Sequence, residues 1–377
     1  MSVSVKPVDD NYIFQLTWLR GLAAFFVIVS HTFRATEVKY SENDEVSSFF
    51  LLSLFDLGSF GVVLFFALSG CTLFISNASK VGFNDLGVFY VKRFFRIWPA
   101  FAIAIIFYIS FRWFFSTWYI EPQGLWVEKQ FLLEYSIYDL ISYLTFTSNF
   151  AGSGGYFNNA FWSLPVEFQY YIIFPVIIAS LKFGALGPMV IGVVLYFFPK
   201  LGLIIMDDNV VFLLAFSFCG GVMAGYLYNK YPVRLNPVFG LVLFTGLLGL
   251  ASAISQSYLV LPDLMFISSK SNWYSSIAIV SVYIVLVTKI NLHNKLEAFL
   301  KHYGTISYST YLYHNLFVAI AVLFIINFEI YDKDLRLFIT FVFTLLASYF
   351  VASWSYKFVE MPSINIGRNI IKKYSKR

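Results

Sequence analysis

Long apolar runs, separated by short polar segments, make up most of the chain. A helix needs ~20 such residues to cross the hydrocarbon core of a bilayer. The fifth run is short and ends at Pro199, and an apolar segment at 138–150 is long enough only for an interfacial or re-entrant piece. We predict ten spans, at about residues 13–33, 57–76, 99–118, 162–181, 184–200, 210–228, 236–254, 272–290, 305–326 and 335–357.

The distribution of charge between these runs assigns the two sides of the membrane. Cytoplasmic loops retain Lys and Arg, and a cytoplasmic N-terminus places 18 of the 26 basic residues on that side. The opposite side then receives the acidic cluster Glu37, Glu42, Asp44 and Glu45. Arg20 interrupts the first run, which is therefore not a cleavable signal sequence. The pattern predicts an all-α, polytopic helical bundle of about ten spans with both termini in the cytoplasm.

The composition excludes a water-soluble globular enzyme, because 59% of the 377 residues are hydrophobic and only 12% are charged. In a membrane protein the net charge of +5 reflects its loops, so we infer no nucleic-acid partner. Cys71 and Cys219 stand far apart in apolar stretches, which indicates neither a disulfide framework nor a metal site. We expect one membrane-embedded domain over residues 1–377, without an appended soluble extracytoplasmic domain.

Ionisable side chains at membrane depth are costly and therefore mark candidate functional residues. Arg20 and His31 in the first span lie ~16 Å apart along a helix axis and ~20° apart around it, so they share one face. A snorkelling topology charge and an interfacial histidine are the respective structural alternatives. The pair nevertheless places a cation and a titratable ring along one line through the membrane.

Two further spans carry polar groups. The fourth opens with Phe161–Glu167, which contains Trp162 and Ser163 and places the Glu167 carboxylate inside the apolar stretch. Its structural alternative is a partner for an intramembrane Arg or His. The ninth span is dense in hydroxyl groups from Ile306 to Tyr313, and ordinary hydrogen bonding between packed helices explains most of them. This span also contains Tyr308, and His314 lies near its middle.

Arg93 and Arg96 precede the third span and are adjacent on a helix, three residues apart. Two neighbouring guanidinium groups form a suitable phosphate clamp, because each presents a planar fork of donors. Retention of basic residues on the cytoplasmic side would also explain them. No P-loop, dinucleotide fingerprint, nucleophile elbow or metal-spaced cluster occurs in the chain.

Taken in order, six segments of the chain resemble the motifs of the acyltransferase 3 family of integral membrane acyltransferases, over residues 11–365. The chain departs from the family at Phe168, where a second acid is frequent, and at Cys71, where an aromatic residue is frequent. The segments are Leu19–Ala24 through to His31, Phe60–Val62 with Phe65–Gly70, Arg93–Pro99, Trp162–Glu167, Ser307–His314 and Val359–Pro362.

The resemblance implies a transmembrane O-acyltransferase, most simply an O-acetyltransferase, that transfers an acyl group from cytoplasmic acyl-CoA to a hydroxyl on the far side. Arg93, Arg96 and Arg20 would hold the CoA phosphates. His31 would be the general base at the thioester, ~16 Å from Arg20, a distance comparable to the pantetheine arm. An acyl-histidine intermediate is the alternative. Glu167 would orient or charge-stabilise the imidazole. The supporting residues would be Ser69, Trp162, Ser163, Tyr308 and His314.

The same resemblance implies the partners. Acetyl-CoA is the expected co-substrate, no metal is required, and the acceptor is a glycan such as O-antigen, exopolysaccharide or a lipid-linked saccharide of a bacterial envelope. The protein is expected as a multi-pass protein of the inner (plasma) membrane. Many relatives carry a C-terminal extracytoplasmic hydrolase-like domain, so a separate extracytoplasmic protein is a candidate partner here.

Two other classes of function remain open from the sequence. A secondary transporter or exporter would also have ten spans and interior Arg, His and Glu, but it predicts inverted repeats that we do not find. A non-catalytic relative that flips or scaffolds glycans would need no such set of Arg20, His31, Arg93 and Arg96. The complete set favours the enzyme.

Overall fold

The computed structural model describes eight stretches of the chain, and the statements below refer to those residues. Their regular structure is helical, with one isolated parallel bridge between Leu235 and Thr288. The predicted all-α class is therefore confirmed for this part of the protein. The described residues are 10–36, 50–77, 86–118, 131–152, 155–199, 210–256, 270–288 and 293–374.

Nine helical segments of the described chain are long and apolar enough to span a membrane. The fifth predicted span corresponds to α8 (Leu186–Phe197), whose 12 residues extend only ~18 Å. The segment at 138–150 contains α6 (Ile137–Leu144), which at 8 residues is too short to cross. The helices of the nine spans are α1 (Asp10–Thr36), α3 (Gly58–Asn77), α4 (Leu86–Trp118), α7 (Ser163–Ala179), α10 (Ala215–Lys230), α11 (Pro237–Ser255), α12 (Lys270–Val287), α14 (Ser307–Asn327) and α15 (Lys333–Ser355).

The chain divides into two compact units whose segments alternate along the sequence. The first unit comprises 1–26, 57–86 and 169–305, and the second comprises 27–56, 87–168 and 306–377. The helices α1 and α7 each contribute residues to both. The expectation of one domain over the whole chain stays a prediction, and each unit is described by itself.

In the first unit, α3 and α10 cross with their backbones in close contact. A Cβ atom built at Gly221 of α10 would lie 2.0 Å from the carbonyl oxygen of Ala67, and one at Gly70 of α3 would lie 2.1 Å from that of Phe218. Only glycine permits this approach from either side. Small residues at such crossings are how helices pack in a membrane, where burial of apolar surface gives little driving force.

We expect Gly221→Ala to sharply reduce the yield of folded protein. The added methyl cannot fit against the Ala67 backbone without separating α3 from α10, and overpacking of this kind costs ~1–3 kcal/mol or more. Thermal unfolding of purified protein in detergent measures the effect. Gly246→Ala in α11 is the matched control, since nothing lies within 4 Å of a Cβ there. Equal melting temperatures for the two variants would contradict the tight crossing.

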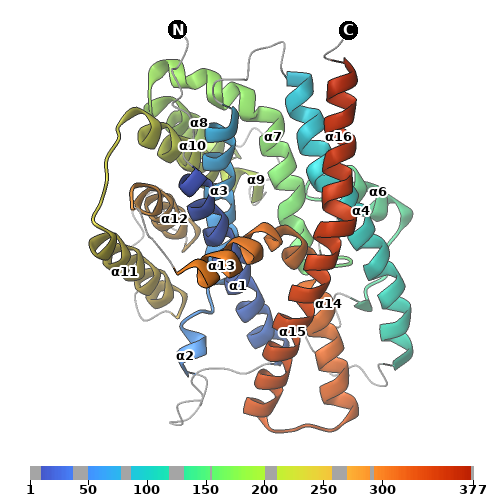
Figure 1. The fold of residues 1–377 in the computed structure, drawn as a ribbon. Coiled ribbons are helices and arrows are strands. Elements are labelled where there is room, and N and C mark those ends of the chain that lie inside the picture. Colours follow the sequence, from blue (N-terminus) through green and yellow to red (C-terminus); the bar gives the residue numbers. More distant parts are fainter. Residues whose placement is uncertain are drawn as a thin grey trace. The chain divides into compact units, whose positions relative to one another are not determined.

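The second unit is built around α14, of which nearly every residue is buried. Figure 1 shows α14 and α15 side by side, and α16 (Met361–Tyr374) continuing the line of α15. A π-helical turn, η5 (Tyr356–Glu360), joins α15 to α16. The 3₁₀ helix η2 (Asn159–Trp162) leads into α7 and packs on α14.

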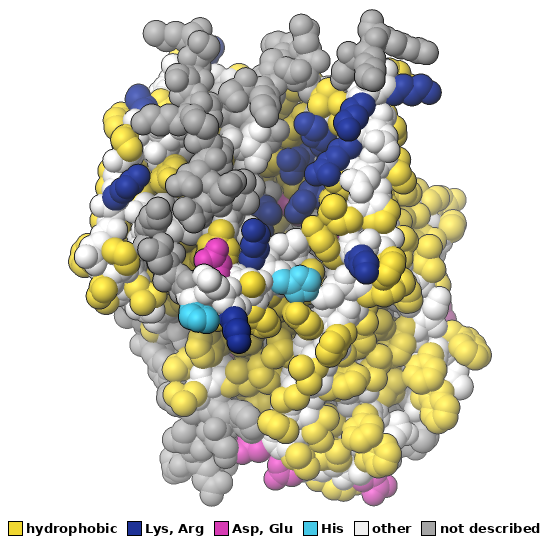
Figure 2. Space-filling model, viewed as in Figure 1, with side chains coloured by type: hydrophobic (Ala, Val, Ile, Leu, Met, Phe, Trp, Pro, Cys, Tyr) yellow, Lys and Arg dark blue, Asp and Glu magenta, His cyan; other side chains and the backbone are white. Residues whose placement is uncertain are grey.

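Charged residues lie at both ends of the continuous helix formed by α15, η5 and α16. Asp332 caps its first turn and Asp334 lies within it, whereas Lys372 and Lys373 lie in its last turn. Figure 2 shows that Lys and Arg side chains gather over α4 and α16. The last turn is thus basic, while the first turn carries Lys333 between its two acids. The assignment of the basic end to the cytoplasm stays a prediction.

Candidate active site

His31 lies in the second unit and is buried against α14. Its Nδ1 is 2.8 Å from Nε2 of His314 and 2.7 Å from Oδ1 of Asn315. The two imidazole rings are nearly parallel, with centroids 5.0 Å apart. The structure thus joins two residues that the sequence placed in separate spans, and it adds an asparagine as a second partner of the same nitrogen.

The backbone of α14 determines which nitrogen of His314 carries a proton. Nδ1 of His314 lies 2.9 Å from the carbonyl oxygen of Tyr311 and 3.3 Å from that of Thr310. Carbonyl oxygens only accept, so this nitrogen donates. In the neutral ring Nε2 is then an acceptor, and it takes a hydrogen bond from Nδ1–H of His31.

An independent chain of hydrogen bonds leads to the same proton on His31. Oδ1 of Asn158 accepts from the backbone N–H of Ala160 at 2.8 Å, and Nδ2 of Asn158 donates to the carbonyl of Leu312 at 3.1 Å. Nδ2 of Asn315 must therefore donate to Oδ1 of Asn158, at 2.6 Å, which turns the Asn315 oxygen toward His31. That oxygen requires a donor, so Nδ1 of His31 carries the proton.

With its proton on Nδ1, neutral His31 has its basic lone pair on Nε2. The imidazole is held in this tautomer by two acceptors, each anchored to backbone groups of α14 or η2. In a neutral histidine so oriented, the nitrogen opposite the anchored one is the one that can take a proton, which is the arrangement that a general base requires. Tyr108 extends the network: its hydroxyl accepts from Nδ2 of Asn158 at 2.9 Å and donates to the Leu312 carbonyl.

The motif at the start of α7 packs beside this network. The Tyr311 hydroxyl donates to the carbonyl of Ala160 at 2.7 Å and accepts from Oγ of Ser163, also at 2.7 Å. Trp162 is half-buried in η2. Glu167 is half-buried one turn further on, and its charge acts on Tyr311. The predicted role of Glu167 as the orienting group of His31 stays a prediction, while His314 and Asn315 contact the ring directly.

Three residues of the arginine motif, Phe95, Ile97 and Trp98, are each held by another element of the unit. The Tyr308 hydroxyl donates to the carbonyl of Ile97 at 2.9 Å, and Nε1 of Trp98 donates to that of Leu144 at 2.8 Å. Phe95 packs on Gly367 of α16. The turn that carries the predicted phosphate clamp is therefore rigidly positioned.

Arg93 and Arg96 both project from this turn of α4 and are half-buried. The guanidinium of Arg93 lies 5.7 Å from the ring centroid of Phe89, a cation–π geometry that orients it. Each side chain keeps a planar fork of donors of the kind that binds phosphate oxygens bidentately.

Arg20 and Ser69 belong to the first unit, whereas the other predicted site residues belong to the second. Ser69 is buried in α3, and Arg20 is half-buried in α1. The neighbouring Gly21 packs on Tyr303 of α13 (Asn294–Thr305), where burial raises the pKa of the Tyr303 hydroxyl. The predicted part of Arg20 in phosphate binding, and that of Ser69 as a supporting residue, stay predictions.

Sequence reasoning missed three residues of the hydrogen-bond network: Asn158, Asn315 and Tyr108. Asn315 directly follows His314 at membrane depth, so the rule that selected the histidine could have found it. Asn158 precedes the Phe161–Glu167 motif and is the N-cap of η2. Asparagine is favoured at this position because it caps a helix, whether or not it has a functional role. Tyr108 is one of 26 tyrosines and carries no distinguishing signal.

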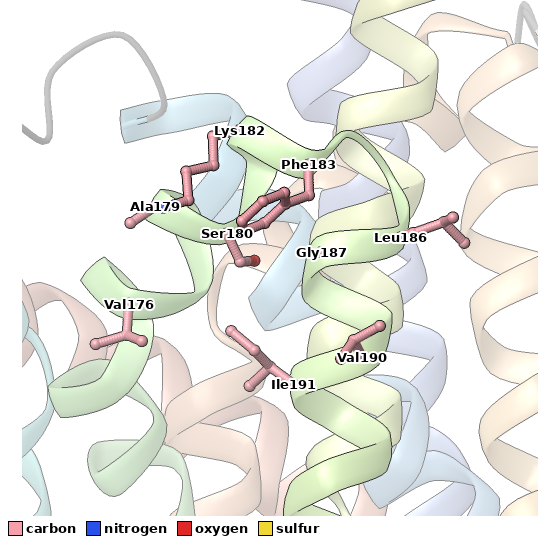
Figure 3. A pocket seen from close by; sticks show the side chains of 9 residues that line it. All are labelled: Val176, Ala179, Ser180, Lys182, Phe183, Leu186, Gly187, Val190 and Ile191. Atoms are coloured by element: carbon pink, nitrogen blue, oxygen red, sulfur yellow. The ribbon is translucent and has the colours of Figure 1, made fainter.

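An apolar groove of ≈ 480 Å³ lies in the first unit, between the end of α7 and α8. Figure 3 shows Val176 of α7 and Ile191 of α8 facing one another across it. Lys182 in η3 (Ser180–Phe183) has its ammonium 4.8 Å from the ring centroid of Phe183. None of the residues that line the groove is a predicted site residue.

Comparison with known proteins supplies the family. The profile of a family described as an acyltransferase domain, the acyltransferase 3 family, matches residues 13–357. The chain is 24% identical over 349 residues to a Staphylococcus aureus (strain COL) protein named "Putative O-acetyltransferase", covering 81% of this chain and 52% of that protein. It is 27% identical over 233 residues to an O-acetyl transferase of Shigella phage Sf6, covering 60% of this chain and 59% of that protein. The chain thus spans about half the length of the first of these relatives. No solved structure matches.

Proposed function

The chain belongs to the acyltransferase 3 family, and from this premise we propose that it is a transmembrane O-acyltransferase that transfers an acetyl group from acetyl-CoA to a glycan hydroxyl. The acceptor is an extracytoplasmic or lipid-linked saccharide, and the protein works in the inner (plasma) membrane of a bacterial cell. The observation that carries this proposal is the anchored tautomer of His31, because acyl transfer to an alcohol needs a base that is ready to take its proton.

The reaction uses the basic nitrogen of His31. The acceptor hydroxyl loses its proton to Nε2 while its oxygen attacks the thioester carbonyl carbon. The carbon–sulfur bond then breaks, the CoA thiolate leaves, and the imidazolium returns the proton to sulfur. During the charged interval the positive charge on His31 is stabilised through Nδ1–H by Nε2 of His314 and Oδ1 of Asn315. The ester product and free CoA account for every atom.

The donor binds through its phosphates to Arg93 and Arg96. Both guanidinium groups lie on a turn whose neighbouring residues are anchored to α14, α16 and the α6 segment, so little side-chain and backbone freedom is lost when an anion binds. Charge-assisted hydrogen bonds from arginine to phosphate are the strongest interactions available for this purpose. Glu167 acts in this scheme as a carboxylate that stabilises positive charge at the site.

We expect membranes containing the protein to transfer radiolabelled acetyl from acetyl-CoA to saccharide, and membranes lacking it to transfer none. Arg93→Gln combined with Arg96→Gln should raise the KM for acetyl-CoA at least ~10-fold, since each lost charge-assisted contact costs ~1.5–3 kcal/mol. Lys333→Gln is the control, because that residue is an exposed cation at the opposite end of α15. An absence of transfer with acetyl-CoA and with longer acyl-CoA donors would overturn the proposed function.

A further inference from the structure

Basic residues are numerous on the first part of α4 and on α16, but the reaction above uses only Arg93 and Arg96. Neither helix contains Asp or Glu, so no acid of their own offsets this charge. Figure 2 shows the Lys and Arg side chains of this region gathered on the visible face, over α4 and α16. The basic residues concerned are Lys92, Arg93 and Arg96 of α4, and Arg368, Lys372 and Lys373 of α16.

A packing contact determines where these two helices meet. A Cβ built at Gly367 of α16 would lie 2.9 Å from Cβ of Phe95 of α4, which is closer than two side chains tolerate. The backbone of α16 therefore lies directly on the Phe95 side chain. Figure 1 shows α4 and α16 running in opposite directions, with α16 leading to the C-terminus. From this contact, regular helix geometry gives the side on which each basic residue lies.

On α4, the basic residues near the contact all lie on one side of it. Each residue of an α-helix turns ~100° about the axis. Counted from Phe95, this rotation places Lys92 at ~60°, Arg96 at ~100° and Arg93 at ~160°. Trp98 lies ~60° away in the opposite sense, on the side where its indole contacts the α6 segment. The basic side of α4 is thus the side away from α6.

On α16, two of the three basic residues lie on this same side. Counted from Gly367, Arg368 lies at ~100° and Lys372 at ~140° around the helix. Because the two helices are antiparallel, rotation in the positive sense leads from the contact to the same side on both. Lys373 lies ~120° away in the opposite sense. The shared side, here named the basic flank, carries Lys92, Arg93, Arg96, Arg368 and Lys372.

The basic flank is short along the helix axes. With a rise of ~1.5 Å per residue, Arg96 and Lys372 lie ~9 Å apart along the axes, and Arg93 and Arg368 lie at nearly the same level between them. The guanidinium of Arg368 is exposed and donates to Oδ1 of Asn365, 3.3 Å away, which engages one of its five N–H donors. CoA carries a diphosphate and a 3′-phosphate on one ribose, so its phosphates form two neighbouring groups. Two arginines suffice for one of these groups, and the flank has cations for both.

We propose that Arg368 and Lys372 bind the 3′-phosphate of acyl-CoA, beside the diphosphate that Arg93 and Arg96 hold. The inference rests on the proposed function, in which these two arginines of α4 bind the acyl donor. The thioester lies at the end of the arm that begins at the diphosphate, so the diphosphate takes the inner cations and the ribose phosphate takes the outer ones. A phosphate monoester carries about −1.5 to −2 charges at neutral pH, and two neighbouring cations match that charge.

The rival interpretation is that these residues serve the membrane. Basic residues are retained on the cytoplasmic side of membrane proteins, and clusters of them attract anionic lipid headgroups. Neither effect requires cations from two helices to fall on one side of a contact, and neither distinguishes Lys372 from Lys373. Both effects predict that the protein binds acyl-CoA equally well with and without its 3′-phosphate.

The test compares acetyl-CoA with acetyl-3′-dephospho-CoA, by KM, kcat and equilibrium binding, on the intact protein in nanodiscs of zwitterionic lipid. Such nanodiscs contain no anionic headgroups that could occupy the basic flank. We expect the intact protein to bind the dephospho compound ~10-fold more weakly, because the charge-assisted contacts to the 3′-phosphate are lost. Arg368→Gln combined with Lys372→Gln should weaken acetyl-CoA binding ~10-fold, leave binding of the dephospho compound unchanged and leave kcat the same with both.

Lys373→Gln is the matched control, because it removes a cation from the same turn of α16 but from the other side of the helix. This variant should keep the full preference for the 3′-phosphate. Equal binding of the two compounds by the intact protein would overturn the inference, as would an equal loss for both compounds in the double variant. A loss of preference in Lys373→Gln as large as in the double variant would overturn it as well. Failure of the intact protein to transfer acetyl from either compound would instead overturn the proposed function itself.

Discussion

His31→Gln is expected to lower kcat for acetyl transfer ~10³-fold, because a positioned general base contributes ~10²–10⁴-fold and glutamine has no basic nitrogen. The amide retains polar groups that can still pair with His314 and Asn315, so the packing around α14 should survive. The measurement is label transfer from acetyl-CoA to saccharide in membranes that contain equal amounts of each protein.

Binding and chemistry must be separated for this variant. CoA affinity should be unchanged in His31→Gln, since the phosphate-binding arginines are untouched. His302→Gln is the matched control, because that histidine is exposed on α13 and should transfer acetyl at the rate of the intact protein. Undiminished transfer by His31→Gln would remove His31 from the mechanism.

His314→Phe is expected to lower kcat ~10²-fold while the KM for both substrates stays the same. Phenylalanine fills a similar volume but cannot accept from Nδ1–H of His31, which loses the partner at 2.8 Å. Of the two acceptors at Nδ1, the Asn315 oxygen then remains. A smaller fraction of His31 carries its lone pair on Nε2, and the imidazolium formed during transfer is less stabilised.

The two acceptors of His31 can be tested together. Combining His314→Phe with Asn315→Leu removes both, and activity should fall to the level of His31→Gln with no further loss when all three changes are combined. Thermal unfolding of each variant reports whether the α14 packing survives. Full activity of His314→Phe in a folded protein would show that the anchored tautomer has no catalytic importance.

The amino-acid order alone was sufficient to predict the helical spans. A bilayer requires backbone groups to be paired within the segment, so a sufficiently long apolar run must form a helix. Nine of the ten predicted ranges coincide broadly with long helices of the described chain. The discrepancy at 184–200 has a local cause. The run contains Gly184, which has φ 75°, and Pro199, and the helix between them is only α8.

Candidate functional residues could be identified from the sequence, because ionisable side chains and motif aromatics are easily recognised within apolar segments. The sequence did not show which of these residues contact one another. His31 and His314 are separated by 283 positions, and no periodicity within either span specifies that their rings face one another. Asn158 and Asn315 were missed because only ionisable side chains were selected at membrane depth, although these two amides determine the tautomer of His31.

The sequence by itself determined that the chain is a helical membrane protein and where most of its spans lie. It also placed His31 and His314 inside spans and two adjacent arginines just before the third span, since apolar length and charge are properties of single segments. Only the tertiary structure decided the tautomer of His31 and the contacts that hold the arginine turn of α4. Both depend on hydrogen bonds and packing between helices that are distant in the sequence. Which ring nitrogen carries the proton depends on the donors and acceptors around it, and the packing of segments that are distant in the sequence decides which groups those are.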